Sequence, residues 1–374
     1  MQQEYTSTAN NKLYKTTIRT TTMSSQQAVV LVKKGQLEIQ ERPIPEVEDP
    51  HYVKVEVMAT GICGSDVHFY QEGAIGPFVV NSPMVMGHES SGVVVEVGDA
   101  VTQVSIGDHV AIEPGVPSRY SEETKAGHYN LCPHMRFAAT PPVDGTLVKY
   151  YVSPEDFVHK VPKEIPFAQV ALIEPLSVAV HSNKLGGTKF NDTVVVMGAG
   201  PIGLVCGQVA RSFGASTVVY VDIKAASLKV ASEHFGASAV VNAKEVSKPL
   251  DEAIRDAVGG KKIDVVLECT GSAPCVDAGL KSIGAGGTFV VVGMGANSIP
   301  IPMNLVSMRE LSIKGCFRYS QGDYNDAVAL VSQGKVHLDK LITATYKFED
   351  AIAAYDNVVS GPPGGIKTII EGPK

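Results

Sequence analysis

The chain has 374 residues, of which 44% are hydrophobic and 19% charged, a balance typical of globular proteins with room for two domains. Its formal net charge of -7 disfavours nucleic acid and acidic membranes as partners. No apolar run is long enough to span a bilayer. The six cysteines are scattered singly, without a CxxC pair, which favours free thiols in a reducing compartment. We therefore expect a cytoplasmic protein with neither a membrane nor a nucleic-acid partner.

Residues 1–27 form a polar segment rich in Thr and Ser. Its basic residues are Lys12, Lys15 and Arg19, and it lacks the apolar core of a secretory signal. A mitochondrial transit segment is one interpretation. The composition favours the other, a disordered tail or an upstream start before Met23.

The pattern after this tail predicts first strands and then an alternation of strands and helices. Short β-branched runs stand at 28–32, 53–58 and 92–97, and the longest irregular segment is 113–142. After Leu172 the alternation predicts a parallel, doubly wound sheet, so the fold class is α/β. The strands expected there are 193–197, 217–221, 239–241, 264–268, 288–292 and 311–314, and the helices are 202–213, 228–235, 249–258 and 273–283.

Gly198, Gly200 and Gly203 match the GxGxxG pattern, which by itself is common in a glycine-rich chain. Here the pattern follows an apolar strand and opens a helix. Gly198 permits the tight turn, Gly200 lets the backbone approach a pyrophosphate, and Gly203 lets the helix pack on the strand. Phosphates would meet free N–H groups at the helix N-terminus. The pattern therefore predicts a dinucleotide site.

Asp222 ends the next strand, about twenty residues further on, where the fingerprint has an acidic residue. Its carboxylate would accept hydrogen bonds from a ribose diol and repel a 2′-phosphate, which favours NAD over NADP. Lys224, close by, works against this preference. The alternative is an Asp that caps the next helix, and its position favours the cofactor role.

Cys63, His88 and Glu89 carry side chains that bind zinc, and three protein ligands would leave a fourth position open for catalysis. Spacing alone does not establish such a site. A single Cys is more often a small core residue, and a single His is more often a structural one.

Two segments around these residues resemble the zinc signature of the medium-chain alcohol dehydrogenases: Gly61-Ile62-Cys63-Gly64-Ser65-Asp66, and Gly87-His88-Glu89-Ser90-Ser91-Gly92 followed by Gly98. The resemblance runs from about residue 28 to the C-terminus. Within that superfamily the chain resembles sorbitol and xylitol dehydrogenases, and Pro133-His134-Met135 is similar to the fungal branch. The segments that carry this finer resemblance are His68-Phe69-Tyr70, Ala111-Ile112-Glu113-Pro114-Gly115, Tyr129-Asn130-Leu131-Cys132-Pro133, Ala139-Thr140-Pro141-Pro142, Glu174-Pro175-Leu176-Ser177-Val178 and Phe317-Arg318-Tyr319.

The resemblance implies a Rossmann domain at 177–315 that binds NAD and a GroES-like catalytic domain at 28–176 and 316–374. It implies a zinc held by Cys63, His88 and Glu89, with Glu174 beside it as an occasional ligand or through a water. Ser65 and His68 match the family's proton relay. The substrate contacts implied are Phe69, Phe137, Thr140, Glu174, Arg318 and Tyr319, and further NAD contacts are Ile202, Val292, Gly293, Met294, Phe317 and Arg318.

Three departures qualify the resemblance. Animal sorbitol dehydrogenases have Tyr where this chain has Phe69 and Arg where it has Ser227, so one substrate contact and the adenosine site differ. Many relatives hold a structural zinc with four cysteines in the irregular loop. Segment 113–142 contains only Cys132, so we expect one zinc per chain.

The resemblance implies oxidation of sorbitol or xylitol at C2, giving fructose or xylulose, with NAD as hydride acceptor. Zinc would lower the pKa of the alcohol, and the relay would carry its proton to water. L-arabinitol or another secondary alcohol is an alternative substrate, and relatives suggest a homotetramer. Two other classes are a catalytically silent NAD-binding protein and a quinone or enone reductase, and the complete ligand trio argues against both.

Overall fold

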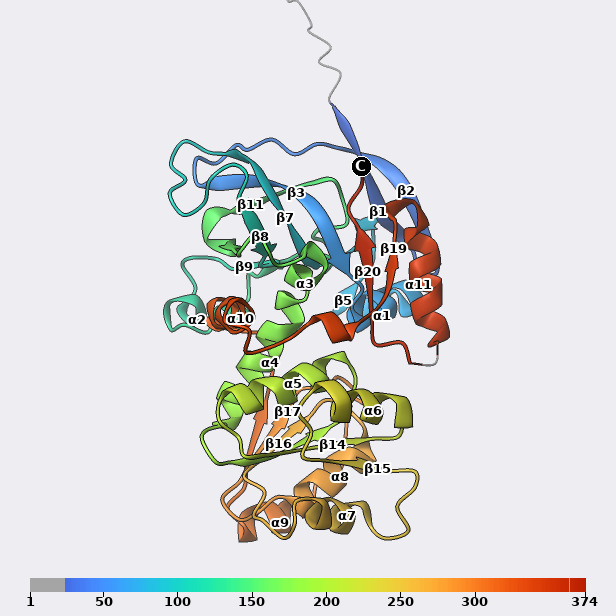
Figure 1. The fold of residues 1–374 in the computed structure, drawn as a ribbon. Coiled ribbons are helices and arrows are strands. Elements are labelled where there is room, and N and C mark those ends of the chain that lie inside the picture. The colour runs from blue at the N-terminus through green and yellow to red at the C-terminus, as the bar shows by residue number, and fades with distance from the viewer. Residues whose placement is uncertain (1–23, 363) are drawn as a thin grey trace, which may run out of the picture.

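The computed structural model describes residues 24–362 and 364–374, which form two bodies stacked end to end (Figure 1). The expected tail lies outside the described residues as far as residue 23. The remainder of that expectation is wrong, because strand β1 (Ser25–Lys33) begins inside it and pairs with β2 (Gln36–Pro43). The side chain of Gln26 also anchors this start, exchanging hydrogen bonds with the backbone of Tyr150.

The upper body is built around strand β3 (Tyr52–Gly61), the longest strand of a seven-stranded sheet. The sheet order is β12-β8-β7-β3-β20-β19, and β11 pairs with β3 off this path. The C-terminal strands, drawn in red, thus return to lie beside the N-terminal β3, drawn in blue (Figure 1). The other strands are β7 (Glu89–Val97), β8 (His109–Ile112), β11 (Tyr150–Pro154), β12 (Val158–Lys160), β19 (Ile342–Tyr346) and β20 (Lys367–Glu371).

Short elements connect these strands. Helix α1 (Gly64–Glu72) follows β3 directly, and helix α11 (Ala351–Ser360) covers the same side of the sheet (Figure 1). The segment expected to be irregular, 113–142, holds only pieces of two to four residues. The remaining elements of this body are β4 (Ala74–Ile75), β5 (Phe78–Val79), β6 (Met84–Val85), β9 (Gly115–Val116), α2 (Glu122–Lys125), η1 (Tyr129–Leu131), β10 (Arg136–Phe137), η2 (Glu155–Phe157), α3 (Phe167–Ala171), α10 (Asp323–Ser332), η3 (Asp339–Leu341) and η4 (Phe348–Asp350).

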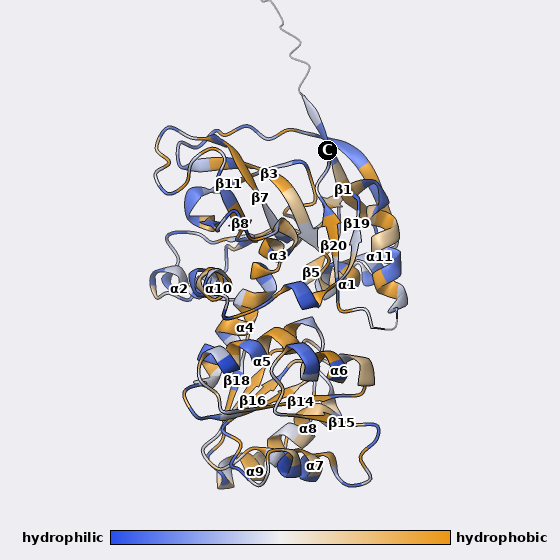
Figure 2. Cartoon of the chain, viewed as in Figure 1, coloured by the Kyte–Doolittle hydropathy of each residue, from blue (hydrophilic) through white to orange (hydrophobic). Residues whose placement is uncertain are grey.

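The lower body is a six-stranded parallel sheet with helices on both faces, as the alternation predicts. Its order is β15-β14-β13-β16-β17-β18, and its strands are apolar where the helices cover them (Figure 2). The strands are β13 (Thr193–Met197), β14 (Thr217–Asp222), β15 (Ala239–Asn242), β16 (Val265–Glu268), β17 (Thr288–Val291) and β18 (Ser312–Gly315). The helices are α4 (Ile173–Gly186), α5 (Pro201–Ser212), α6 (Ala225–His234), α7 (Leu250–Ala257), α8 (Ala273–Ser282) and α9 (Met303–Met308).

Buried β-branched residues explain why this sheet is parallel. All five residues of β13 are buried, so both faces of the central strand need an apolar cover, and crossover helices provide it. Gly214 ends the first crossover with a φ of +101°, as expected just past a helix C-terminus. Helix α4 runs across the expected domain boundary at residue 176, whereas β18 ends at Gly315, where that boundary was expected. Within the described part of the chain, no helix has the length and apolarity needed to cross a membrane.

Candidate active site

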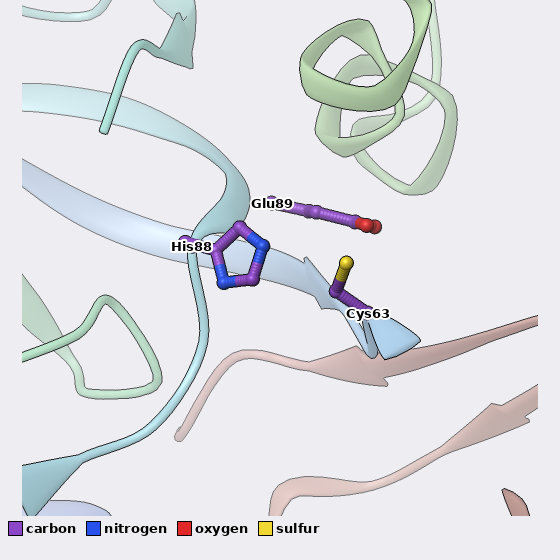
Figure 3. Close-up of side chains that lie close together, drawn as sticks. All are labelled: Cys63, His88 and Glu89. Atoms are coloured by element: carbon purple, nitrogen blue, oxygen red, sulfur yellow. The ribbon is translucent and has the colours of Figure 1, made fainter. Parts of the chain in front are cut away.

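Three buried or half-buried side chains from the upper body converge on one point. Cys63 is the N-cap of α1, His88 lies in the turn before β7, and Glu89 is the first residue of β7. One donor atom from each lies within 4.8 Å of the other two. Figure 3 shows the sulfur, the imidazole and the carboxylate pointing toward one another. The structure therefore brings together the trio that the resemblance assigns to zinc.

The register of β3 against β7 creates the room for this trio. The sequence placed Glu89 ahead of a strand at 92–97, but the strand begins at Glu89, which stands opposite Gly61. A Cβ at Gly61 would overlap a carboxylate oxygen of Glu89. The β-branched pattern alone missed this start because Ser90, Ser91 and Gly92 have low strand propensity, and cross-strand pairing overrides it.

Asp66 stands behind His88 and was not assigned a role from the sequence. Its Oδ1 lies 3.2 Å from His88 Nδ1, although the angle falls short of a hydrogen bond. Its Oδ2 accepts a hydrogen bond from the backbone N–H of Cys63. Burial lowers the pKa of His88, but the charges of Asp66 and Cys63 together raise it by more. The surroundings of His88 therefore favour positive charge at this point. A carboxylate behind a ligating His also fixes its ring orientation.

Lys367, at the start of β20, is the second residue that the sequence analysis missed. Its Nζ donates to Oε1 and Oε2 of Glu89, at 2.6 and 2.7 Å, and to the carbonyl of Ile62 at 3.0 Å. Burial lowers the pKa of Lys367, but the charges of Glu89 and Cys63 outweigh that effect and raise it. No local sequence signal links residues 278 positions apart. Only the pairing of β20 with β3 brings them together.

Glu174 and Tyr319 form the buried wall beside the trio. Burial raises the pKa of Glu174, the charge of His88 lowers it, and the charge of Glu89 raises it further. The side chains of Glu174, His88 and Glu89 therefore lie close enough to influence one another. Glu174 is not among the residues whose donor atoms lie within 4.8 Å of one another. The hydroxyl of Tyr319 is buried without a hydrogen-bond partner. Such an orphaned donor points to a ligand or water in the space that it faces.

Arg318 connects this wall with the loop 113–142. Its guanidinium carbon lies 3.6 Å from the centre of the Phe137 ring and 4.7 Å from that of Phe317. Its Nη2 donates to Thr140 at 3.4 Å. The ring of Phe137 in turn lies 5.6 Å from that of His88. Arg318, Phe137, Phe317 and Thr140, four of the expected substrate and cofactor residues, thus gather next to the trio of Cys63, His88 and Glu89.

The remaining expected residues of the upper body all lie on α1. Ser65 is half-buried and His68 is exposed, and their spacing of three residues puts both on one face of the helix. Ser65 thus lies close to the N-cap residue Cys63, and His68 lies one turn further along the helix, in contact with solvent. Phe69 is different, because it is buried in the apolar cluster that contains Leu31 and Tyr355. The structure does not bring Phe69 together with Arg318.

The glycine loop of the lower body has the geometry that its pattern predicts. Gly198 has a φ of +98°, which favours glycine. A Cβ at Gly203 would overlap the carbonyl of Gly198, so the helix packs tightly against the turn. Gly200, the N-cap of α5, has no atom within 4 Å of its Cβ position and therefore faces open space. Ile202 is partly buried against the core at the start of the same helix.

Asp222 ends β14 and holds the glycine loop as well as the turn that follows. One carboxylate oxygen accepts from Ala199 N at 2.7 Å, and the other accepts from the backbone N–H groups of Ile223 and Lys224. It does not cap α6, whose N-cap residue is Lys224. Each oxygen has two lone pairs, so the one bonded to Ala199 retains an acceptor position for a ribose hydroxyl.

The turn after β17 adjoins the turn after β16. A Cβ at Gly293 would come within 2.6 Å of the backbone nitrogens of Thr270 and Gly271. Val292 lies against the main core, and Met294 is 64% exposed. The carboxyl ends of β13, β16 and β17 are neighbours in the sheet, and this edge is where doubly wound sheets bind ligands.

The donor set of the upper body fits zinc. A thiolate, an imidazole and a carboxylate are common ligands of this ion, and their tight spacing suits its short bonds. Cys132, the single cysteine of segment 113–142, is buried and accepts a hydrogen bond from Ser118 N. The expectation of one zinc per chain stays a prediction.

Two family models match the chain. The model of the alcohol dehydrogenase GroES-like domain covers residues 49–163, and that of the zinc-binding dehydrogenases covers 201–333. Sorbitol dehydrogenase 1 of Saccharomyces cerevisiae is 55% identical over 94% of this chain and 99% of its own. D-xylulose reductase of the same organism is 49% identical over 95% of this chain and 100% of its own.

A comparison with solved structures finds the same fold among dehydrogenases. L-idonate 5-dehydrogenase of Escherichia coli superposes with a TM-score of 0.85 at 29% identity, covering 93% of this chain and 98% of its own. The resemblance seen in the zinc signature and the Rossmann motif is therefore confirmed along nearly the whole chain. The chain belongs to the zinc-dependent medium-chain dehydrogenases.

Proposed function

We propose that this protein oxidises a polyol at a secondary alcohol, with sorbitol and xylitol oxidised at C2 to fructose and xylulose. The observation that carries the proposal is the polar wall formed by Arg318, Tyr319 and Glu174 next to Cys63, His88 and Glu89. Such a wall suits a substrate that has hydroxyl groups on neighbouring carbons. The names of the sorbitol dehydrogenase and D-xylulose reductase relatives support the same substrate class.

Cys63, His88 and Glu89 would hold the zinc, which when bound supplies Lewis-acid activation of the alcohol. Asp66, whose Oδ1 lies 3.2 Å from His88 Nδ1, would help to orient the imidazole of His88. Ser65 and His68 would receive the alcohol proton and pass it to solvent, since they lie in order of increasing exposure along α1. Glu174 remains a neighbour of the site, as a further ligand or through a water.

Arg318 and Tyr319 would select and orient the polyol chain. The guanidinium is a planar fork that can hold two oxygens at once, and its contacts with the rings of Phe137 and Phe317 limit its movement. The buried hydroxyl of Tyr319 lies near Glu174 and lowers the pKa of that carboxyl, but it meets hydrogen-bond geometry with no protein atom. It would donate to a substrate hydroxyl. Thr140 adds a hydroxyl at the same wall, and Phe137 adds an apolar face.

NAD would lie along the carboxyl edge of the lower sheet. Gly198, Gly200 and Gly203 would accommodate its pyrophosphate, and the charge of Asp222 favours NAD over NADP. Ile202, Val292, Gly293, Met294 and Phe317 would contact the nicotinamide half. The bound dinucleotide supplies the hydride acceptor, and the two turns after β16 and β17 would position its ring.

We also infer that the chain assembles as a homotetramer, in line with the family resemblance. Strand β18 ends the six-stranded sheet, and all four of its residues are exposed. Met303, Met308 and Ile313 expose apolar surface nearby, at 56%, 78% and 38%. An open strand edge with apolar neighbours favours pairing with a second copy. Light scattering should give the mass of four chains, and a mass of one or two chains would contradict this inference.

A cytoplasmic location is a further inference, drawn from the cysteines. All six are free thiols, as a reducing compartment favours. The Thr/Ser-rich segment before β1 leaves a mitochondrial location as the alternative. Fluorescence of a C-terminally tagged chain inside mitochondria would contradict the cytoplasmic assignment.

The first prediction concerns the metal. Elemental analysis should find one zinc per chain, and Cys63→Ser should remove zinc and lower turnover more than about 100-fold, because Lewis-acid activation is worth several kcal/mol. Cys132→Ser is the matched control and should keep both zinc and activity. Two tightly bound zinc ions in the wild type would contradict the one-zinc expectation, and a fully active metal-free protein would contradict the mechanism.

The second prediction concerns the dinucleotide. Asp222→Asn keeps one acceptor oxygen for the glycine loop but removes the charge, so kcat/KM should shift toward NADP by about tenfold or more. Asp222→Ala should weaken both dinucleotides, because Ala199 also loses its partner. Steady-state rates with NAD and NADP measure both effects. Equal wild-type rates with the two dinucleotides would show that the assignment of Asp222 is wrong.

The third prediction concerns the substrate. Arg318→Leu should lower kcat/KM for sorbitol and xylitol at least about tenfold more than for a simple secondary alcohol, because only the polyols use the guanidinium. Ethanol should be a poor substrate of the wild type. Arg119→Leu, which breaks an exposed ion pair with Asp156, is the control. It should leave kcat/KM unchanged for the polyols and for the simple secondary alcohol. Equal losses for both substrate classes would mean that Arg318 serves the cofactor or the fold.

A further inference from the structure

Lys367 is the single buried lysine among residues 24–362 and 364–374, with 5% of its surface exposed. Its three ammonium protons match its three acceptors, which are both oxygens of Glu89 and the carbonyl of Ile62. A buried charge is tolerated only when it is paired and hydrogen-bonded in this way. The interaction between Lys367 and Glu89 is therefore a buried, fully hydrogen-bonded ion pair and not a surface contact.

The carboxylate of Glu89 contacts both the trio and Lys367. One of its oxygens is a donor atom of the trio with Cys63 and His88, and both oxygens touch Lys367. A divalent ion at the trio and the ammonium of Lys367 would thus draw on the charge of one carboxylate. Two cations so close together repel each other, and burial strengthens that repulsion.

Packing holds Glu89 in place independently of Lys367. Its backbone is fixed by the β7–β3 ladder, and its side chain fills the space that Gly61 leaves without a Cβ. Removal of the ammonium would therefore change the charge of the site more than its shape. The buried carboxylate would then have the metal as its main counter-charge.

We propose that Lys367 is a positioning residue that pairs with Glu89 and thereby limits the affinity of the site for its metal. This inference rests on the proposed zinc site. The ion pair stabilises the ligand cluster before the metal binds, but the ammonium of Lys367 also competes with zinc for the charge of Glu89. Lys367 contacts neither the wall of Arg318, Tyr319 and Glu174 nor the glycine loop through any of its hydrogen bonds.

The test compares zinc affinity in the full-length wild type, Lys367→Met and Lys367→Arg by competition with a chromogenic chelator. Met has a similar length without the charge, so the zinc dissociation constant of the Lys367→Met variant should fall at least about tenfold. Arg keeps the charge and should stay within about threefold of wild type. Thermal unfolding should show a lower midpoint for zinc-stripped Lys367→Met and a larger rise on zinc addition than in wild type.

Lys184→Met is the matched control, because Lys184 also binds carboxylates, those of Asp323 and Asp326, outside the trio. It should lower the midpoint equally with and without zinc and leave the affinity unchanged. An unchanged or weaker zinc affinity in Lys367→Met would overturn the proposal.

If Lys367→Met does not fold, Lys367→Gln takes its place with the same expectation. Loss of folding by both variants at saturating zinc would also overturn it. A wild type that binds no zinc would instead overturn the proposed function itself.

Discussion

The arrangement of Cys63, His88 and Glu89 depends on the pairing of β3 with β7 on one side and β20 on the other. The ladder places Gly61 opposite Glu89 and Ile369. The chain then turns from the end of β3 into α1 and presents Cys63 beside Glu89. Glu89 is thus fixed by backbone hydrogen bonds between strands far apart in the sequence, and Cys63 and His88 lie immediately next to those strands.

The same ladder concentrates charge in a dry place, and the surrounding residues compensate for it. Asp66 faces His88, Lys367 faces Glu89, and Glu174 lies buried beside both. Asp66 raises the pKa of His88, and Glu89 raises the pKa of both Lys367 and Glu174, so the cluster behaves as one electrostatic unit. A cation at its centre is stabilised by this excess of negative groups, and the single ammonium limits how strongly.

The sequence predicted the lower body better than the upper one, for a physical reason. Strands such as 193–197 are buried on both faces and flanked by glycines, and the helix-strand alternation is local. The upper sheet depends on long-range antiparallel pairing, so Glu89 was placed ahead of its strand and 342–346 and 367–371 were not identified as strands. The trio itself was found through family resemblance, since its spacing was not informative. Asp66 and Lys367 were missed because their role depends on contacts that only the folded chain creates.

The wall of Arg318, Tyr319 and Glu174 contains one unusual backbone conformation. Arg318 has a φ of +57°, which a non-glycine residue adopts only at a cost of about 1–3 kcal/mol. This conformation comes just after β18, where the chain leaves the lower sheet for the upper body. It lets the Arg318 guanidinium stack on Phe137, while Tyr319 is buried beside Glu174. The two bodies thus meet in a segment whose strained residue contacts the loop 113–142, and a substrate that bridged Arg318 and Tyr319 would tie the metal side of the site to the dinucleotide side.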